Sequence, residues 1–273
     1  MMKKIFCLFI IFIIFALPSF SEQCGYNYEC PQIERQKSAL DSFFAKFNGI
    51  DYIQIKFAEI AIEQYIKQKL NNDVSVSIKT ESAKALKNGE FEQITVSADK
   101  IFIDKYVLSD FYAQTICPYN KIIIDNGDFK FPYDVAANFS ACIENDDLNT
   151  IVSQYLGQIN SKYGGLLNVN CFLANSKLNI FISTPLLKQN YVFSTGLAVN
   201  NGNIIFTDLN QYADSIYLKN ITSVLSSINP VYYRVKIASN TYCFINLQTL
   251  SVLDDKIYLQ GLFIIPKNCG ITE

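Results

Sequence analysis

The sequence predicts an α+β fold of antiparallel strands with few helices. Two stretches, at about 55–70 and 148–159, have apolar residues at helical spacing. Elsewhere apolar and polar residues alternate over many short runs, which is typical of half-buried strands. Each helix precedes a long series of strands, whereas parallel sheets alternate single strands with single helices. Long twisted strands with a helix laid across them can wrap an elongated hydrophobic groove.

The first helix and the strand after it have marked ends. Apolar residues recur at helical spacing over 55–70, and the polar run 71–73 ends the helix. From Val74 the apolar period changes to two, which indicates a strand. Asn88-Gly89 then predicts a turn.

The strands that follow contain one irregularity and one tight turn. In 91–103 the apolar phase shifts near Asp99, and a β-bulge would explain the shift. The run Asp-Asn-Gly-Asp at 125–128 begins like a calcium loop but lacks the bidentate Glu, so a type I′ hairpin turn is the simpler interpretation. The other strands expected in this half lie at 106–116, 121–124 and 129–142.

The second half repeats the order of the first. Asn145-Asp146-Asp147 supplies N-cap residues for the 148–159 helix, and Gly164-Gly165 ends it. This helix either packs on the core or closes the mouth of a cavity. A hairpin turn is expected at 200–203 and a short helix at 219–228. The expected strands lie at 178–182, 191–199, 204–209, 231–237, 242–252 and 257–265.

The N-terminus has the pattern of a secretory signal peptide. Lys3 and Lys4 precede an apolar run at 5–17, and small residues suit cleavage before Glu22. A membrane-spanning helix needs about 20 apolar residues, so an uncleaved anchor is the less favoured alternative. We therefore expect an exported protein. Its expected parts are a signal peptide at 1–21, a lead segment at 22–50 and, because no linker divides the rest, a single α+β domain at 51–273.

The composition excludes several classes of function. The formal net charge of −2 becomes −4 once Lys3 and Lys4 leave with the signal peptide. The absence of a basic block argues against nucleic acid as a partner and against a strong electrostatic grip on an anionic membrane. Histidine is absent, which removes Ser-His-Asp and Cys-His catalysis and most transition-metal sites.

Carboxylate pairs offer little for catalysis. The adjacent aspartates at 146–147 and 254–255 point in different directions and are better explained as caps or turns. We therefore expect no catalytic residues, no metal and no cofactor, and a protein that is not an enzyme. A hydrolase acting through two facing carboxylates is the remaining enzymatic alternative.

Cysteines indicate disulfide bonding. Eight are present, and seven remain after loss of Cys7 with the signal peptide. In an oxidising compartment most should pair, and the odd number leaves at least one free or bonded between chains. Cys24 and Cys30 are the nearest local pair. The rest of the connectivity stays open, and no C-x-x-C pair points to zinc.

Several short stretches resemble one family. They are 84–98 (KALKNGEFEQITVSA), 106–111 (YVLSDF), 131–143 followed by the DDLN of 146–149, and 261–266 (GLFIIP). In this order they resemble four parts of the LmeA-like periplasmic phospholipid-binding proteins. These parts are a turn with its strand, the next strand, a strand followed by a "D-L-N" helix start, and the closing strand. The resemblance covers roughly residues 57–266.

The resemblance implies both a fold and a function. The implied fold is a TULIP-like one, in which a highly curved antiparallel sheet wraps round one or two long helices with a lipid-holding groove between. The implied function is binding or carrying a phospholipid-like lipid in the periplasm or cell envelope. The expected partners are a lipid or membrane surface and an envelope protein of unknown identity.

A lipid carrier needs an enclosed apolar groove rather than a reactive group. Each buried methylene gains about 0.8 kcal/mol, so a 16-carbon chain gains on the order of 12 kcal/mol. The residues expected to line such a groove are Ile62 and Ile66 on the first helix and Ile151 and Tyr155 on the second. The alternative is a structural or adhesion-type secreted β protein that binds another protein through an exposed apolar patch.

Overall fold

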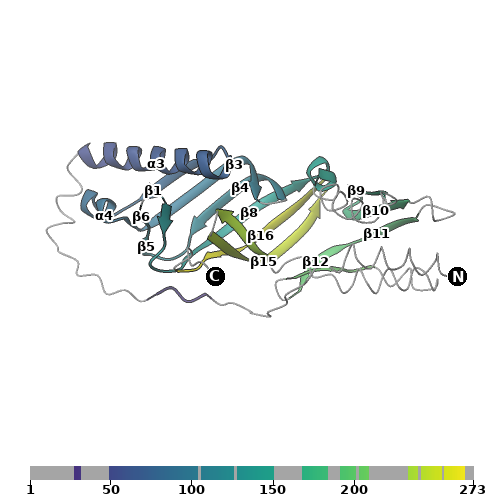
Figure 1. The fold of residues 1–273 in the computed structure, drawn as a ribbon. Helices are drawn as coiled ribbons and strands as arrows, with labels where there is room; N and C mark the ends of the chain where they lie inside the picture. The colour runs from purple at the N-terminus through teal and green to yellow at the C-terminus, as the bar shows by residue number, and fades with distance from the viewer. Residues whose placement is uncertain are drawn as a thin grey trace.

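The computed structural model of this chain consists mostly of antiparallel strands (Figure 1). It describes residues 28–31, 49–103, 106–125, 128–150, 168–183, 191–200, 203–208, 233–238, 241–253 and 255–267. In this part of the chain, 59% of the residues are in strands and 19% in helices. The fold is therefore mostly β, and the predicted α+β class is wrong.

The largest sheet has seven antiparallel strands in the order β1-β3-β4-β8-β16-β15-β14. Their bounds are β1 Ser75–Lys79, β3 Gln93–Ile103, β4 Tyr106–Thr115, β8 Val135–Glu144, β16 Lys256–Ile265, β15 Thr241–Leu253 and β14 Tyr233–Ala238. The register places one apolar row across six neighbouring strands: Val76, Val96, Ala113, Phe139, Gly261 and Leu247. One face of the sheet is apolar along this row because side chains alternate between the two faces.

Smaller sheets extend the structure at both ends (Figure 1). They comprise β9 (Asn168–Ala174), β10 (Lys177–Ser183) and β11 (Tyr191–Thr195); β12 (Leu197–Asn200) with β13 (Asn203–Phe206); β2 (Glu90–Phe91) with β5 (Asn120–Lys121); and β6 (Ile123–Asp125) with β7 (Asp128–Lys130). Asp125 pairs with Asp128, and Asn200 with Asn203, so both predicted hairpins are confirmed.

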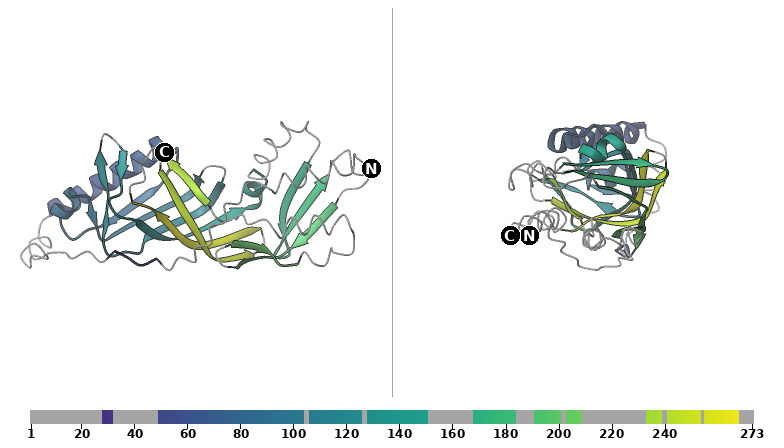
Figure 2. Two further views of the ribbon diagram at one scale, coloured as in Figure 1. Left: turned by 60° about the horizontal axis from the view of Figure 1, so that its bottom comes forward. Right: turned by 90° about the vertical axis from the view of Figure 1, so that its right-hand side faces the viewer.

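One hydrophobic core joins the large sheet to the β9–β11 sheet. It includes Ile101, Leu108 and Phe139 from the large sheet and Val169, Ile180 and Phe193 from the smaller one. Phe193 is completely buried. The two sheets are therefore parts of one packed structure, and Figure 2 shows them following one another along its length.

Helix α3 (Gly49–Leu70) lies along the edge strand β1 (Figures 1 and 2). The backbone N–H of Ile78 donates to Glu59 Oε1, and that of Val76 donates to Glu63 Oε1, each at 2.8 Å. Four residues along a helix rise about 6 Å, and two residues along a strand rise about 6.8 Å. The two carboxylates are therefore spaced to accept from the two N–H groups that no neighbouring strand can reach.

The end of α3 is held in the same manner. Asn71 has a positive φ of 52°, the left-handed conformation that ends many helices. The buried side chain of Asn72 then donates to the carbonyl of Phe102 and accepts from its N–H, at 2.9 and 2.7 Å. The Asn72 side chain thus makes the two hydrogen bonds that a paired strand residue would make with Phe102 of β3.

The second half contains an equivalent contact. A helix begins at Asn145, and its residues up to 150 are described. Asn145 Oδ1 accepts from the N–H of Leu173 at 2.7 Å, and Asn149 Oδ1 accepts from that of Cys171 at 2.9 Å. β9 is an edge strand of its sheet, so a pair of side-chain oxygens four residues apart again completes an edge. The rest of the predicted 148–159 helix and the 219–228 helix lie outside the described residues.

The prediction that the sheet wraps round one or two long helices is wrong. Among the described residues, α3 is the one helix of seven residues or more, and the antiparallel sheets do not wrap round it. That arrangement was implied by the family resemblance, whereas α3 packs one side on the edge of the large sheet and leaves its other side exposed. The side that is not packed on the sheet is described below.

The predicted bulge lies on the neighbouring strand. The pairing of β3 with β4 keeps one register past Asp99, whereas that of β4 with β8 shifts by one residue between Ser109 and Tyr112. Asp110, opposite Asp99, has φ 51° and supplies the extra residue. The apolar phase change in β3 therefore follows a bulge in its partner.

Two further differences from the predicted elements are local. The predicted 129–142 strand is interrupted at 131–134, where Pro132 has no N–H for a ladder. A short helix, α4 (Ala83–Lys87), was not predicted; the Ser82 hydroxyl caps it by accepting from the N–H of Ala85.

Candidate functional site

The outward face of α3 exposes large apolar side chains. We define this face as the exposed residues of α3: Tyr52, Ile53, Lys56, Phe57, Ile60, Ala61, Gln64, Lys67 and Gln68. Tyr52 and Phe57 are 66% and 67% exposed, and Ile53 and Ile60 are 55% and 46% exposed. Soluble proteins seldom leave four such side chains together in water, so a cluster of this kind marks an interaction surface.

The inner side of α3 packs on the sheet. Ile62 and Ile66 are half-buried there and contact the cluster that contains Val76, Ile78 and Ile94. Of the four residues predicted to line a lipid groove, these two therefore lie against the chain's own core. Ile151 and Tyr155 lie outside the described residues, and the lipid contacts of all four stay a prediction.

The charges of α3 are sorted between its two sides. Glu59 is 4% exposed, and both it and Glu63 point at β1, whereas Lys56 and Lys67 lie on the outward face. Lys56 Nζ lies 2.6 Å from Glu59 Oε2 and 5.9 Å from the ring centroid of Tyr52. The hydrogen bond to Glu59 raises the pKa of Lys56 above its usual value. Among α3 side chains that the structure describes, the outward face has these two lysines and no carboxylate.

A groove of about 1340 Å³ lies on the other face of the large sheet from the apolar row. Its floor includes Tyr112 and Gln114 of β4, Asn138 and Ser140 of β8, Gln260 of β16 and Gln248 of β15. Lys79, Glu81 and Glu92 line it as well. This floor of amides and hydroxyls differs from the continuous apolar tunnel that a lipid carrier would need.

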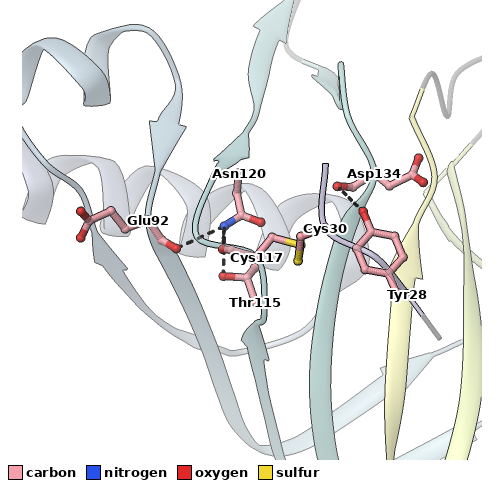
Figure 3. Close-up of a disulfide and its surroundings, with 7 residues drawn as sticks. All are labelled: Tyr28, Cys30, Glu92, Thr115, Cys117, Asn120 and Asp134. Atoms are coloured by element: carbon pink, nitrogen blue, oxygen red, sulfur yellow. Dashed lines mark hydrogen bonds between the residues drawn. A yellow bond between two sulfur atoms is a disulfide. The ribbon is translucent and has the colours of Figure 1, made fainter. Parts of the chain in front are cut away.

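The disulfide between Cys30 and Cys117 forms part of the groove wall (Figure 3). It joins residues 87 apart in the sequence. The predicted local bridge from Cys24 to Cys30 is therefore wrong, because Cys30 is bonded elsewhere. Sequence spacing favours near neighbours, whereas the fold brings 28–31 beside the loop that follows β4.

Two side chains secure this wall. Tyr28 donates to the carbonyl of Asp134 at 3.3 Å, and burial, with the Asp134 charge, raises the pKa of its hydroxyl (Figure 3). Asn120 is 1% exposed and donates to the carbonyls of Cys117 and Glu92 at 2.9 and 3.3 Å. Its Oδ1 is buried without a hydrogen-bond partner.

Membrane-spanning helices and clusters of metal ligands are both absent from the described ranges. None of the helices there combines the length and the apolar character needed to cross a bilayer. The same residues contain no group of three or more potential His, Cys, Asp or Glu ligands placed to hold a metal ion.

The described residues form a mostly β fold with an exposed apolar face on α3. Models of known protein families, curated proteins and solved structures provide no match to the chain. Two surfaces of the described residues can bind a partner: the outward face of α3 and the groove.

Sequence reasoning selected the inner side of α3 and missed these two surfaces. The outward face had a signal, since Tyr52, Ile53, Phe57 and Ile60 form a second apolar stripe on the helix. The groove floor had a weaker one, the amide and hydroxyl residues that alternate with apolar residues in β4, β8 and β16. Neither can be recognised as a surface until the strands are placed side by side.

Proposed function

We propose that this chain is an exported lipid-binding protein that attaches to a lipid surface through the outward face of α3. One observation carries the proposal: four large apolar side chains are exposed together on this face, while the glutamates Glu59 and Glu63 face β1. Helices that lie in the membrane interface present exposed apolar side chains in this manner, with basic residues beside them. The resemblance of residues 57–266 to phospholipid-binding proteins points to the same ligand class.

The exposed apolar side chains can supply useful binding energy. Complete burial of an isoleucine or phenylalanine side chain gains about 1.5–3 kcal/mol. Since each of the four is roughly half exposed, insertion should gain about 1 kcal/mol from each. The total of about 4 kcal/mol suits reversible attachment.

Charge has a smaller part in this attachment than apolar insertion. Electrostatic attraction to a surface falls off within about one Debye length, roughly 8 Å at physiological salt, so the negative net charge of the whole chain does not oppose contact. The exposed charged residues of the outward face are Lys56 and Lys67. Each pairs with a carboxylate, Lys56 with Glu59 and Lys67 with Asp73 just beyond the helix, so their attraction to anionic head groups is reduced.

A second candidate function uses the same surface. A secreted β protein that binds another protein would also have a filled core and an exposed apolar patch, and both features occur here. The position of Lys56 among the apolar residues favours the lipid surface. A lysine stem can reach from an apolar layer to the head groups, whereas the core of a protein–protein contact is depleted of lysine.

Vesicle binding separates the two candidates. The mature chain is mixed with phosphatidylcholine vesicles, with and without phosphatidylglycerol, and the bound fraction is measured by flotation. Replacing Ile53 and Phe57 by serine removes about 2 kcal/mol, so the partition coefficient should fall about thirtyfold. Phe172→Ser is the matched control, since Phe172 is 43% exposed on β9, and it should bind as the wild type does.

The outcomes differ for each candidate. Binding to vesicles that is lost in the Ile53/Phe57 variant supports the lipid function, and it should rise only modestly with phosphatidylglycerol because both lysines are paired. A wild-type chain that binds neither kind of vesicle overturns that function, and the protein-binding candidate then takes its place. Equal loss in the Phe172 control would show that the outward face has no special part.

A further inference from the structure

The floor of the groove carries carboxamides from five neighbouring strands. In spatial order they are Gln93 of β3, Gln114 of β4, Asn138 of β8, Gln260 of β16 and Gln248 of β15. Neighbouring strands lie about 4.8 Å apart, so the five strands cover about 19 Å. The amides follow a diagonal across them, since Gln260 pairs with Ser140 and so lies two residues along the strands from Asn138. Tyr112 and Ser140, which face each other in the register, add two hydroxyl groups to the same floor.

Two of these amides are oriented by their neighbours. The Tyr112 hydroxyl donates to Gln114 Oε1 at 2.6 Å, and the Thr249 hydroxyl donates to Gln260 Oε1 at 3.2 Å. Each contact occupies the amide oxygen and leaves the NH₂ group to donate to a ligand. The ring of Tyr112 is 42% exposed beside them. The floor therefore offers directed donors and an accessible aromatic ring.

The chemistry of the floor restricts the class of ligand. An acyl chain needs an apolar floor, and an anion needs cations at its centre. The lysine lining the groove, Lys79, lies 3.8 Å from Glu92 and so has its charge partly balanced. A neutral ligand with many hydroxyl groups fits better, because each hydroxyl both donates and accepts, as carboxamides do. Its C–H faces can also pack on Tyr112.

The wall makes the groove a fixed feature of the fold. The Cys30–Cys117 disulfide ties residues 28–31 to the loop beside the floor, and Pro118 and Tyr119 of that loop also line the groove. A binding site that is already formed loses less conformational entropy when a ligand binds. The floor itself lies on paired strands of the large sheet, which are rigid supports.

We propose that this groove binds a neutral glycan, with Gln114, Gln260 and Tyr112 as its main contacts. A short oligosaccharide segment is long enough to reach across the five strands that carry the amides. The proposal goes beyond lipid attachment and uses a different surface. The same sugar chemistry occurs in a soluble polysaccharide and in the head group of a neutral glycolipid, and the test distinguishes these two sources.

Titration of the mature chain with neutral hexasaccharides tests the proposal. Maltohexaose, cellohexaose, xylohexaose and mannohexaose are added separately, and binding is followed by calorimetry and by tyrosine fluorescence, since the chain has no tryptophan. Phosphatidylcholine vesicles containing digalactosyldiacylglycerol form the glycolipid arm, and only binding above that of the same vesicles without the glycolipid is counted, because α3 is proposed to attach to both. A hexamer of galacturonic acid is the charged comparison and should bind at least tenfold more weakly than the best neutral probe.

Substitutions locate the binding. The double variant Gln114→Ala/Gln260→Ala should weaken the best neutral probe at least tenfold, and Tyr112→Ala should abolish the fluorescence response. Asn170→Ala, which removes an exposed amide on β9 away from both surfaces, is the matched control and should leave binding unchanged. Binding of the glycolipid vesicles alone would assign the lipid-borne source.

Three results would overturn the proposal. They are failure of every neutral probe including the glycolipid, equal binding of the charged hexamer, and binding that persists in the Gln114/Gln260 variant. Attachment to phosphatidylcholine vesicles should be unaffected by that variant. Failure of glycan binding is therefore distinguishable from failure of lipid attachment.

Discussion

Replacing Glu59 by leucine should destabilise the protein because it removes the acceptor of a buried N–H. Ile78 donates to Glu59 Oε1 at 2.8 Å, and both residues are buried. A buried donor that loses its partner costs about 1–3 kcal/mol. We expect the free energy of unfolding to fall by about 2 kcal/mol, which lowers the melting temperature by about 4–8 °C in a chain of this size.

Two variants separate this effect from loss of the ion pair. Glu59→Gln keeps an amide oxygen in place for the Ile78 N–H, and most of the stability should remain. Lys56→Ala removes the charged partner of Glu59 Oε2 and leaves that buried carboxylate uncompensated, so it should lower stability by an amount that measures the ion pair by itself.

The measurement is urea unfolding of residues 22–273 with the disulfide intact, followed by far-UV circular dichroism. The reasoning is refuted if Glu59→Leu unfolds at the same urea concentration as the wild type. It is equally refuted if the glutamine variant falls as far as the leucine variant, since the edge contact would then depend on charge rather than on an acceptor oxygen.

The remaining predictions concern cysteines. Cys30→Ser opens the loop closed by cysteines 87 residues apart and should lower the free energy of unfolding by about 2–5 kcal/mol relative to the wild type in urea without reductant. With reductant the two proteins should unfold at similar urea concentrations, whereas equal midpoints without reductant would contradict the prediction. Burial raises the pKa of Cys171 to about 12 from its ordinary 9.0. Between these two pH values the Cys171 thiol is ionised in the unfolded chain but still protonated in the folded chain. The free energy of unfolding should therefore fall by about 1.4 kcal/mol for each pH unit in this range. Cys171→Ala should show a shallower fall above pH 9, and parallel pH profiles would exclude the effect.

Local structure followed from the sequence because its signals are local. The strand at 75–79, the turn at Gly89 and the two hairpins depend on residues within a few positions of one another. The placement of α3 did not follow. Its apolar residues point in every direction, and the contacts that fix it are made by Glu59 and Glu63, whose role requires strand β1 to be in place.

Functional surfaces were harder to predict than elements. Ile62 and Ile66 were expected to line a lipid groove, and in the structure they are half-buried against the chain's own core. Net charge averages over the whole chain, so it does not reveal that α3 keeps its two inner glutamates apart from the lysines of its outward face. The disulfide could not be derived, since Cys30 meets Cys117 only after β4 is placed.

Side-chain oxygens on two helices accept hydrogen bonds from the edge strands β1 and β9, where the backbone of a further strand would otherwise pair. Glutamates serve β1 and asparagines serve β9, so the spacing of four residues recurs while the residue type does not. An uncovered strand edge is a template on which another copy can add its own strand. A molecule whose α3 detached would offer that template while the sheet was still intact. Such a molecule is expected to aggregate through β1. Glu59 and Glu63 protect against this by keeping α3 bound to that edge.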